Sequence, residues 1–157
     1  MRFLSRLELQ NLTAVGHTPR ETQEFPSDRT RLRFCFSTRR TPDELKHRTK
    51  TFAVEIVKFA RKLPHDVATH HIAGQVLRSG TAVGSNYRAS CRAKSGADFI
   101  SKMTNVEEEA DETLFWLEVL VDSDTLPRKA VATLMDEAEQ LLRIVVASIK
   151  TARGRSR

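Results

Sequence analysis

The side chains of this sequence that could bind a metal ion or transfer protons do not form a complete set. His70 and His71 are adjacent, so in a helix they point about 100° apart and cannot bind the same ion. Glu44 and His47 have the Glu-x-x-His spacing of di-iron helical bundles, which also need a second copy of that motif and two further inward glutamates. The sequence has no second copy. We therefore interpret the pair as surface residues of a first helical turn and expect no metal site.

Two further groups are similar to parts of catalytic sites. His65 and Asp66 have the order of a dyad found in metal phosphohydrolases, but they lie in a predicted turn and we interpret them as turn residues. Cys91 is close to several cations, a setting typical of reactive thiols, and we interpret it as a partly buried structural thiol. The sequence contains neither a glycine-rich phosphate loop nor a nucleophile elbow. We expect no catalytic residue, no cofactor and no enzymatic activity.

Length and composition limit the class of protein. The chain has 157 residues, 39% hydrophobic and 29% charged, which is typical of one soluble globular domain. Six glycines and five prolines are few for an all-β chain with many turns. There is no run of about 18 apolar residues, so no membrane-spanning helix is expected. Cys35 and Cys91 are far apart and form neither a zinc motif nor a disulfide framework, so we expect a cytoplasmic protein without a membrane partner.

Residues 1–40 differ from the rest of the chain. They show no sustained hydrophobic period and hold eight arginines against four acidic residues, a net charge of +4. Pro19 and Pro26 would interrupt a helix. We predict a disordered basic leader over residues 1–40, and a start codon assigned too far upstream would give the same composition. The four acids disfavour a mitochondrial presequence, which is poor in acidic residues.

From residue 41 onward the pattern is helical. Thr41, Pro42 and Glu44 have the order of a helix start, with a capping residue, a proline at the first helical position and a glutamate that completes a capping box. Pro64 is expected to end this first helix near residue 63. Its apolar stripe consists of Phe52, Ile56, Phe59 and Leu63.

Three further helices follow with short connections. The pattern predicts a second helix over residues 67–92, a third from its cap at Ser95 to about residue 121, and a fourth that begins at Pro127. Residues 153–157 form a basic tail that we expect to fray. Residues 41–152 are therefore predicted to fold as an all-α, antiparallel up-down four-helix bundle, because no strand pattern competes.

The second and third predicted helices carry opposite charges. Residues 67–97 hold four cations and no acid, whereas residues 98–122 hold eight acids against one lysine, a net charge of −7. At about 100° per residue, Arg78, Arg88 and Arg92 share one edge of the second helix. The opposite edge is apolar and includes Ile72, Val76 and Val83.

This charge pattern has two interpretations. Neighbouring helices or subunits can be matched in charge, which determines register and partner choice more than it stabilises. Alternatively, the basic edge contacts the phosphates of nucleic acid. Residues 41–157 hold 18 cations and 16 acids, so residues 1–40 account for most of the excess positive charge. The residues that we predict to contact nucleic acid are Arg78, Arg88, Arg92 and Lys94.

Glycines interrupt the second predicted helix at positions 74, 80 and 84. Each costs about 1 kcal/mol relative to alanine in a helix interior. Small side chains at Gly80, Gly84 and Ala89 would let another helix approach closely. The alternative is a kink or break around residues 79–81. Either way, this segment is not expected to be a plain solvated helix.

Two segments carry a resemblance to a known family. Residues 75–89 read Gln-Val-Leu-Arg-Ser-Gly-Thr-Ala-Val-Gly-Ser-Asn-Tyr-Arg-Ala, and this stretch resembles the signature of the four-helix-bundle proteins that are also called the 23S ribosomal RNA intervening-sequence protein family. Residues 95–117 resemble the third-helix pattern of that family, and the resemblance covers about residues 43–150. The residues that we assign to the family signature and to an oligomer interface are Gln75, Ser79, Gly80, Gly84, Asn86, Tyr87, Asp98, Phe99, Glu108, Glu112 and Trp116.

The resemblance implies a cytoplasmic bacterial protein of four antiparallel helices that assembles as a ring-shaped homopentamer. Genes of the family often lie in insertions within ribosomal RNA genes. A related group, the accessory proteins of diversity-generating retroelements, forms similar basic pentamers that bind nucleic acid and a reverse transcriptase. None of these properties implies an enzyme.

Three classes of function follow from the sequence. The first is a homo-oligomeric module that binds the RNA or DNA backbone. The second is a protein-interaction scaffold whose charged helices serve only assembly. The third is an enzyme whose site forms across subunits. Salt-dependent binding of RNA separates the first from the second, because neutralising phosphates releases counterions.

Overall fold

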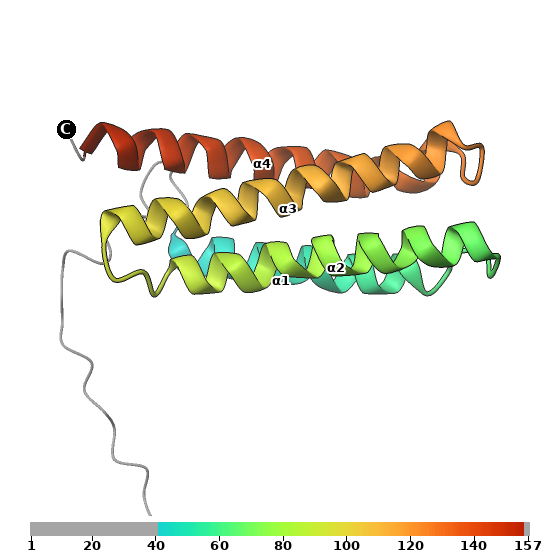
Figure 1. The fold of residues 1–157 in the computed structure, drawn as a ribbon, viewed down its shortest axis with the longest axis horizontal. Helices are drawn as coiled ribbons and strands as arrows, with labels where there is room; N and C mark the ends of the chain where they lie inside the picture. The colour runs from blue at the N-terminus through green and yellow to red at the C-terminus, as the bar shows by residue number, and fades with distance from the viewer. Residues whose placement is uncertain (1–40, 156–157) are drawn as a thin grey trace, which may run out of the picture.

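The computed structural model describes residues 41–155, and the predicted leader over residues 1–40 lies outside the described residues. Four helices follow one another: α1 (Pro42–Ala60), α2 (Val67–Ser90), α3 (Gly96–Asp122) and α4 (Arg128–Arg155). Successive loops lie at opposite ends of the molecule, so the chain runs up and down (Figure 1). The described residues contain no strand. The predicted all-α four-helix bundle is confirmed.

Helix starts are fixed by side-chain caps, as the sequence predicts for α1 and α3. Glu44 N donates to Thr41 Oγ1 at 3.2 Å, and Thr41 N donates to Glu44 Oε2 at 2.8 Å, which completes the capping box. Ser95 accepts from the backbone of Asp98 and caps α3. Asp66 caps α2 by accepting from Thr69 N at 2.9 Å, which gives a structural role to one residue of the predicted turn.

The ends of three helices differ from the predictions by a few residues. Helix α1 ends at Ala60, because Pro64 disfavours helical geometry at the residue before it and the last turn tightens, with Leu63 N bonding to Ala60 O. Helix α2 ends at Ser90 rather than near residue 92. Helix α4 continues to Arg155, so the segment that we expected to fray from residue 153 is partly helical. Ala152 is buried in the core and extends the apolar stripe to this end of the helix.

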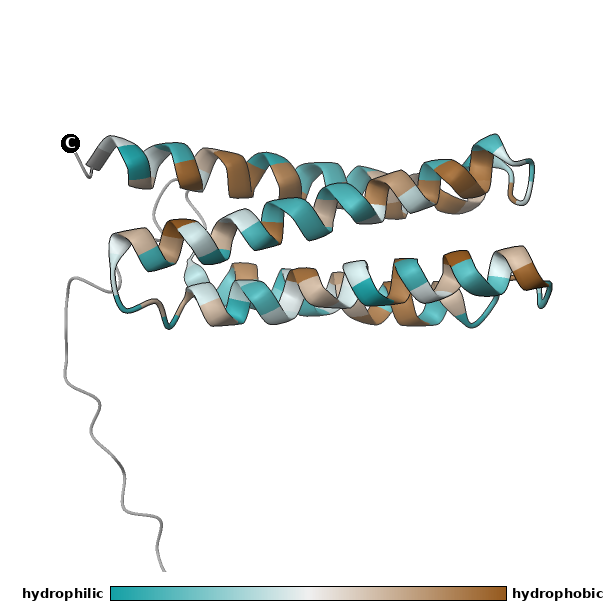
Figure 2. Cartoon of the chain, in the orientation of Figure 1, coloured by the Kyte–Doolittle hydropathy of each residue, from teal (hydrophilic) through white to brown (hydrophobic). Residues whose placement is uncertain are grey.

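The core is built from apolar side chains of all four helices. Hydrophobic and hydrophilic residues alternate along every helix (Figure 2). Consecutive helices pack along their lengths, whereas α1 and α4 touch over a much shorter stretch. The largest fully buried side chains include Tyr87, Phe52, Ile56, Met103, Leu117 and Leu141.

Two of the three α2 glycines allow α2 to approach α1 closely. A Cβ atom on Gly80 would lie 2.8 Å from Ile56 Cγ1, and one on Gly84 would lie 3.1 Å from the Thr49 carbonyl oxygen. Helix α2 is continuous through both positions. Of the two alternatives, close approach of a neighbouring helix is therefore correct and a break around residues 79–81 is wrong. Gly74 has no atom within 4 Å of its Cβ position, so nothing within the bundle requires glycine there.

We expect Gly80→Ala and Gly74→Ala to change stability in opposite directions. The Gly80 variant overpacks the buried and stiff Ile56 side chain, which outweighs the gain in helix propensity and lowers the free energy of unfolding by up to about 2 kcal/mol. The matched Gly74 variant gains propensity without a clash and should be roughly 0.5–1 kcal/mol more stable. Urea unfolding followed by circular dichroism measures both. Equal stabilisation by the two substitutions would show that Ile56 does not limit the approach of α2.

Candidate functional site

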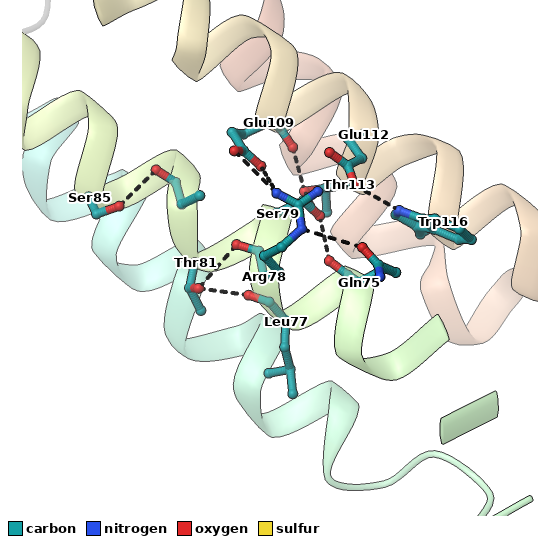
Figure 3. Close-up of polar contacts among 11 residues, drawn as sticks. Gln75, Leu77, Arg78, Ser79, Thr81, Ser85, Glu109, Glu112, Thr113 and Trp116 are labelled. Atoms are coloured by element: carbon teal, nitrogen blue, oxygen red, sulfur yellow. Dashed lines mark hydrogen bonds and ion pairs between the residues drawn. The ribbon is translucent and has the colours of Figure 1, made fainter. Parts of the chain in front are cut away.

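Arg78 lies on the side of α2 that faces the acidic row of α3. Its Nη1 lies 3.3 Å from Glu109 Oε2, and its Nη2 forms an ion pair with Glu112. Its Nε also donates to Gln75 Oε1 at 3.3 Å. Figure 3 shows the guanidinium between the two glutamates. The charge of Arg78 is thus compensated within the chain. In this respect Arg78 differs from the other three residues that we predicted to contact nucleic acid.

The two glutamates respond differently to this arginine. The hydrogen bond from Arg78, followed by one from Trp116 Nε1 at 3.1 Å, holds the pKa of the Glu112 carboxyl below its usual range. Burial raises the pKa of Glu109, and the longer contact with Arg78 does not offset it. The hydrogen bond to Glu112 raises the pKa of Arg78 in turn. Glu112 is therefore the principal anionic partner of Arg78.

A buried polar contact fixes α2 against α3 beside this cluster. Thr113 Oγ1 lies 2.9 Å from Ser79 Oγ and 2.7 Å from the Glu109 carbonyl oxygen. Ser79 Oγ donates to the Gln75 carbonyl at 3.0 Å. Both hydroxyls are fully buried, so each needs such a partner. The pair ties the two helices together at the level of Arg78, and its hydroxyls are occupied by these contacts.

The other three predicted cations lie at the far end of α2. Arg88 is in the last turn of the helix, where a positive charge also suits the helix dipole. Arg92 and Lys94 follow in the turn that leads to α3. All three are exposed, and none forms an ion pair with a carboxylate among residues 41–155. Their charges are available to a ligand.

The carboxyl-terminal turns of α4 bring two more cations to the same end of the bundle (Figure 1). Lys150 and Arg153 are exposed and form no ion pair within the described part of the chain. Sequence reasoning missed Arg153 because it assigned residues 153–157 to a frayed tail, and it did not consider Lys150, which lies within the predicted fourth helix. The continuing stripe of Val145, Ile149 and Ala152 was the available signal. The surface that we call the basic end consists of Arg88, Arg92, Lys94, Lys150 and Arg153.

Asp98 compensates one cation near the basic end and occupies the start of α3. Its carboxylate accepts from Lys94 N at 2.8 Å and forms an ion pair with Lys102. The hydrogen bond from Lys102, with that from Lys94, holds the pKa of Asp98 below its usual range. The amino-terminal turn of α3 is therefore already occupied by a carboxylate from this chain. Because Lys102 is paired with that carboxylate, it is not free to bind a ligand as the five cations of the basic end are.

Five of the eleven predicted signature residues pack the helices of one chain against one another. Ser79, Gly80, Gly84, Tyr87 and Phe99 are buried inside the bundle. In the single chain these five side chains do not lie at the surface. The signature residues that remain half-buried or exposed are Gln75, Asn86, Asp98, Glu108, Glu112 and Trp116.

The other groups that could do chemistry stay apart. Residues 41–155 contain no cluster of three or more histidine, cysteine or acidic side chains able to hold a metal ion. Glu44 is engaged in the cap of α1, and Cys91 is half-buried at the end of α2. None of the helices formed by the described residues is long and apolar enough to cross a membrane.

Comparison with known proteins supports the fold and the resemblance. A family model described as 23S rRNA-intervening sequence protein matches residues 44–147, which span α1 to α3 and most of α4. The chain is similar to a solved structure of a protein with unknown function from the S23 ribosomal protein family of Bacteroides thetaiotaomicron VPI-5482. The two share 31% sequence identity with a TM-score of 0.65, and the match covers 69% of this chain and 97% of that chain. No curated protein matches the chain.

The Arg78–Glu112 pair should be visible in the fluorescence of Trp116, which is the only tryptophan. Because the pKa of Glu112 is lowered, we expect its protonation to change the emission only below the ordinary glutamate range. Arg78→Gln should move this midpoint upward, whereas the control Arg88→Gln should leave it in place. An unchanged midpoint in the Arg78 variant would contradict the assigned pairing.

The Arg78–Glu112 pair also predicts how the free energy of unfolding changes with pH. A carboxyl whose pKa is lower in the folded than in the unfolded chain contributes its full stabilisation when the pH is above its pKa in the unfolded chain. This contribution is lost as the pH falls through its pKa in the folded chain. The difference in stability between the wild type and Arg78→Gln should therefore shrink on acidification.

Proposed function

The chain belongs to the 23S rRNA-intervening sequence protein family, and we propose that it is a non-enzymatic, self-associating protein that binds the backbone of RNA or DNA through its basic end. The observation that carries this proposal is the division of charge on α2. Arg78 is compensated by α3, whereas Arg88, Arg92 and Lys94 are exposed without a carboxylate partner in the described residues. Exposed, uncompensated cations are the groups that neutralise phosphates.

The geometry of the basic end favours phosphate contacts over base contacts. Its cations come from two helix ends and one turn, and the described part of the chain offers no exposed aromatic side chain among them. Contacts of this kind orient a nucleic acid and give little sequence preference. Several copies in one assembly would repeat the cluster and strengthen its field. We therefore propose binding with a strong salt dependence, in the cytoplasm.

Self-association is supported by the charges on the outer side of α3. Glu108, Asp111, Glu118 and Asp122 are exposed and have no cation partner among residues 41–155. Phe115, which lies between them on the same helix, is 53% exposed. A large exposed aromatic side chain within a charged surface is typical of an interaction site. A second copy can supply the missing cations and cover the ring.

Charge reversal at the basic end tests nucleic-acid binding. Arg88→Glu with Arg92→Glu should weaken binding to RNA and DNA and flatten the plot of log affinity against log salt by about 0.7–0.9 for each phosphate that is no longer neutralised. Fluorescence polarisation across a salt series measures this slope. The matched control is Arg128→Glu with Lys129→Glu, the same change of charge at exposed positions at the start of α4, which should keep the wild-type slope.

Two results would reject the binding proposal in favour of the scaffold alternative. One is a wild-type protein that binds no nucleic acid even at low salt. The other is a basic-end variant that dissociates into monomers, because its arginines would then serve assembly rather than phosphate binding.

Light scattering tests self-association independently of nucleic-acid binding. The mass of one chain is 17.8 kDa, and light scattering at micromolar concentration and moderate salt should give several times this value. The family resemblance implies five copies. A monomer under these conditions would reject self-association while leaving the salt-slope experiment to decide on nucleic-acid binding.

A further inference from the structure

The bundle has an open seam between α1 and α4. These two helices touch over a much shorter stretch than the three pairs of consecutive helices. Small side chains at Ala130 and Thr133 line the α4 side. Neither α1 nor α4 therefore fills the space between them at this end of the bundle.

One open part of the seam, where α1 ends and α4 begins, is a mostly apolar groove of about 400 Å³. Its floor is formed by side chains of the core and its edge: Phe59, Leu63, Leu126 and Leu134. Lys58, Lys62 and Glu55 stand on its α1 rim and are exposed; Lys58 Nζ lies 2.7 Å from Glu55 Oε1, so Lys62 supplies the uncompensated positive charge of the rim. We call this hollow the seam groove.

Further along the seam, the two helices are bridged by a bidentate ion pair. Arg48 Nε lies 2.6 Å from Glu137 Oε1, and Arg48 Nη2 lies 2.7 Å from Glu137 Oε2. Arg48 Nη2 also donates to Gln140 Oε1 at 2.8 Å. The hydrogen bond to Glu137 raises the pKa of Arg48. This bridge ties α1 to α4 toward the basic end, and the hollow of about 710 Å³ around it is lined mostly by polar and charged residues, whereas the hollow with the lysine rim is lined mostly by apolar side chains.

The outer side of α3 has the opposite character. Phe115 protrudes there, packed edge-on against Trp116 with ring centroids 5.0 Å apart. Asp111 and Glu118 are one helical turn away on either side and are exposed. This surface is an apolar projection with an acidic border, whereas the seam groove is an apolar hollow whose rim is net positive through Lys62, because Lys58 is paired with Glu55.

The two surfaces also lie at the same height along the bundle. Phe115 precedes the end of α3 by seven residues, and Leu134 follows the start of α4 by six. At about 1.5 Å per residue, both are roughly 10 Å from the loop that joins these helices. Two copies in the same orientation can therefore bring Phe115 of one to the seam groove of the other without sliding along the axis.

We propose that Phe115 of one copy inserts into the seam groove of the next, with Asp111 and Glu118 beside Lys58 and Lys62. The contact joins two different surfaces, so it is heterologous and repeats from copy to copy, closing into a ring or continuing as a filament. Because the copies stand side by side in the same orientation, all basic ends lie on one face of the assembly. The proposal rests on the self-association proposed above and names the surfaces that produce it.

Variants of the full chain test the projection and the groove separately. Phe115→Ser removes the projection, and Thr133→Trp fills the groove from its exposed rim. Each should lower the mass measured by light scattering toward the 17.8 kDa of one chain, with unchanged helical circular dichroism. Val54→Ser, which alters another exposed hydrophobic side chain on α1 at 43% exposure, is the matched control and should keep the wild-type mass.

An exchange of charges distinguishes this contact from general loss of packing. Asp111→Lys with Glu118→Lys should lower the mass, and so should Lys58→Glu with Lys62→Glu. All four substitutions in one chain restore opposite charges across the interface and should restore the assembly. Recovery does not depend on which lysine meets which acid.

The outcomes separate this inference from the proposed function. A wild-type assembly whose mass is unchanged in the Phe115 and Thr133 variants, or not recovered by the charge exchange, would overturn the interface and leave nucleic-acid binding untouched. A monomeric wild type would overturn the interface together with self-association. Arg88→Glu with Arg92→Glu should keep the assembled mass, since the basic end is opposite to this contact.

Discussion

The ion pairs between Arg78 of α2 and two glutamates of α3 decide which charges of the bundle remain at its surface. Helix α2 has cations without acids, and α3 has acids with one lysine. Only at the level of Arg78, where the Ser79–Thr113 contact fixes the two helices, do these opposite charges meet within the described part of the chain. The other cations at the carboxyl-terminal end of α2 extend past the acidic row. The result is a molecule with a basic end and an acidic outer side.

This distribution follows from helix packing and not from a dedicated binding site. Close approach of α2 to α1 at Gly80 and Gly84 uses the inner side of α2. The contact with α3 uses the neighbouring side, and the outer edge that remains carries the arginines. Because a helix presents each residue at a fixed angle, packing on two sides determines what the third side exposes. The basic end gains Lys150 and Arg153 because an even number of antiparallel helices returns the chain to the end at which it began.

The open seam has a similar origin. A chain that runs up and down through four helices packs each helix on its predecessor, and the closing contact between the first and last helix depends on the side chains that line their seam. Here small side chains at Ala130 and Thr133 face the end of α1, so one stretch of the seam is not filled. An apolar hollow at the surface is a site where another copy can add contacts that the single chain cannot make. In the proposed assembly, the open stretch of the seam and the exposed Phe115 are parts of the same interface.

The sequence by itself determined the number of helices, their caps and the stripes that form the core, because these depend on residue spacing and on local backbone preferences. Thr41, Glu44 and Ser95 act within one turn of chain, and the stripes repeat at the helical period. Only the tertiary structure decided that Arg78 is compensated while Arg88 and Arg92 are not, since all three share one edge of a helix and differ only in what lies opposite. Arg48 and Glu137, which bridge the seam, are 89 residues apart in the chain, and no local pattern links them. The tertiary structure also chose close packing over a kink at Gly80, because the deciding atoms belong to the side chain of Ile56 on another helix.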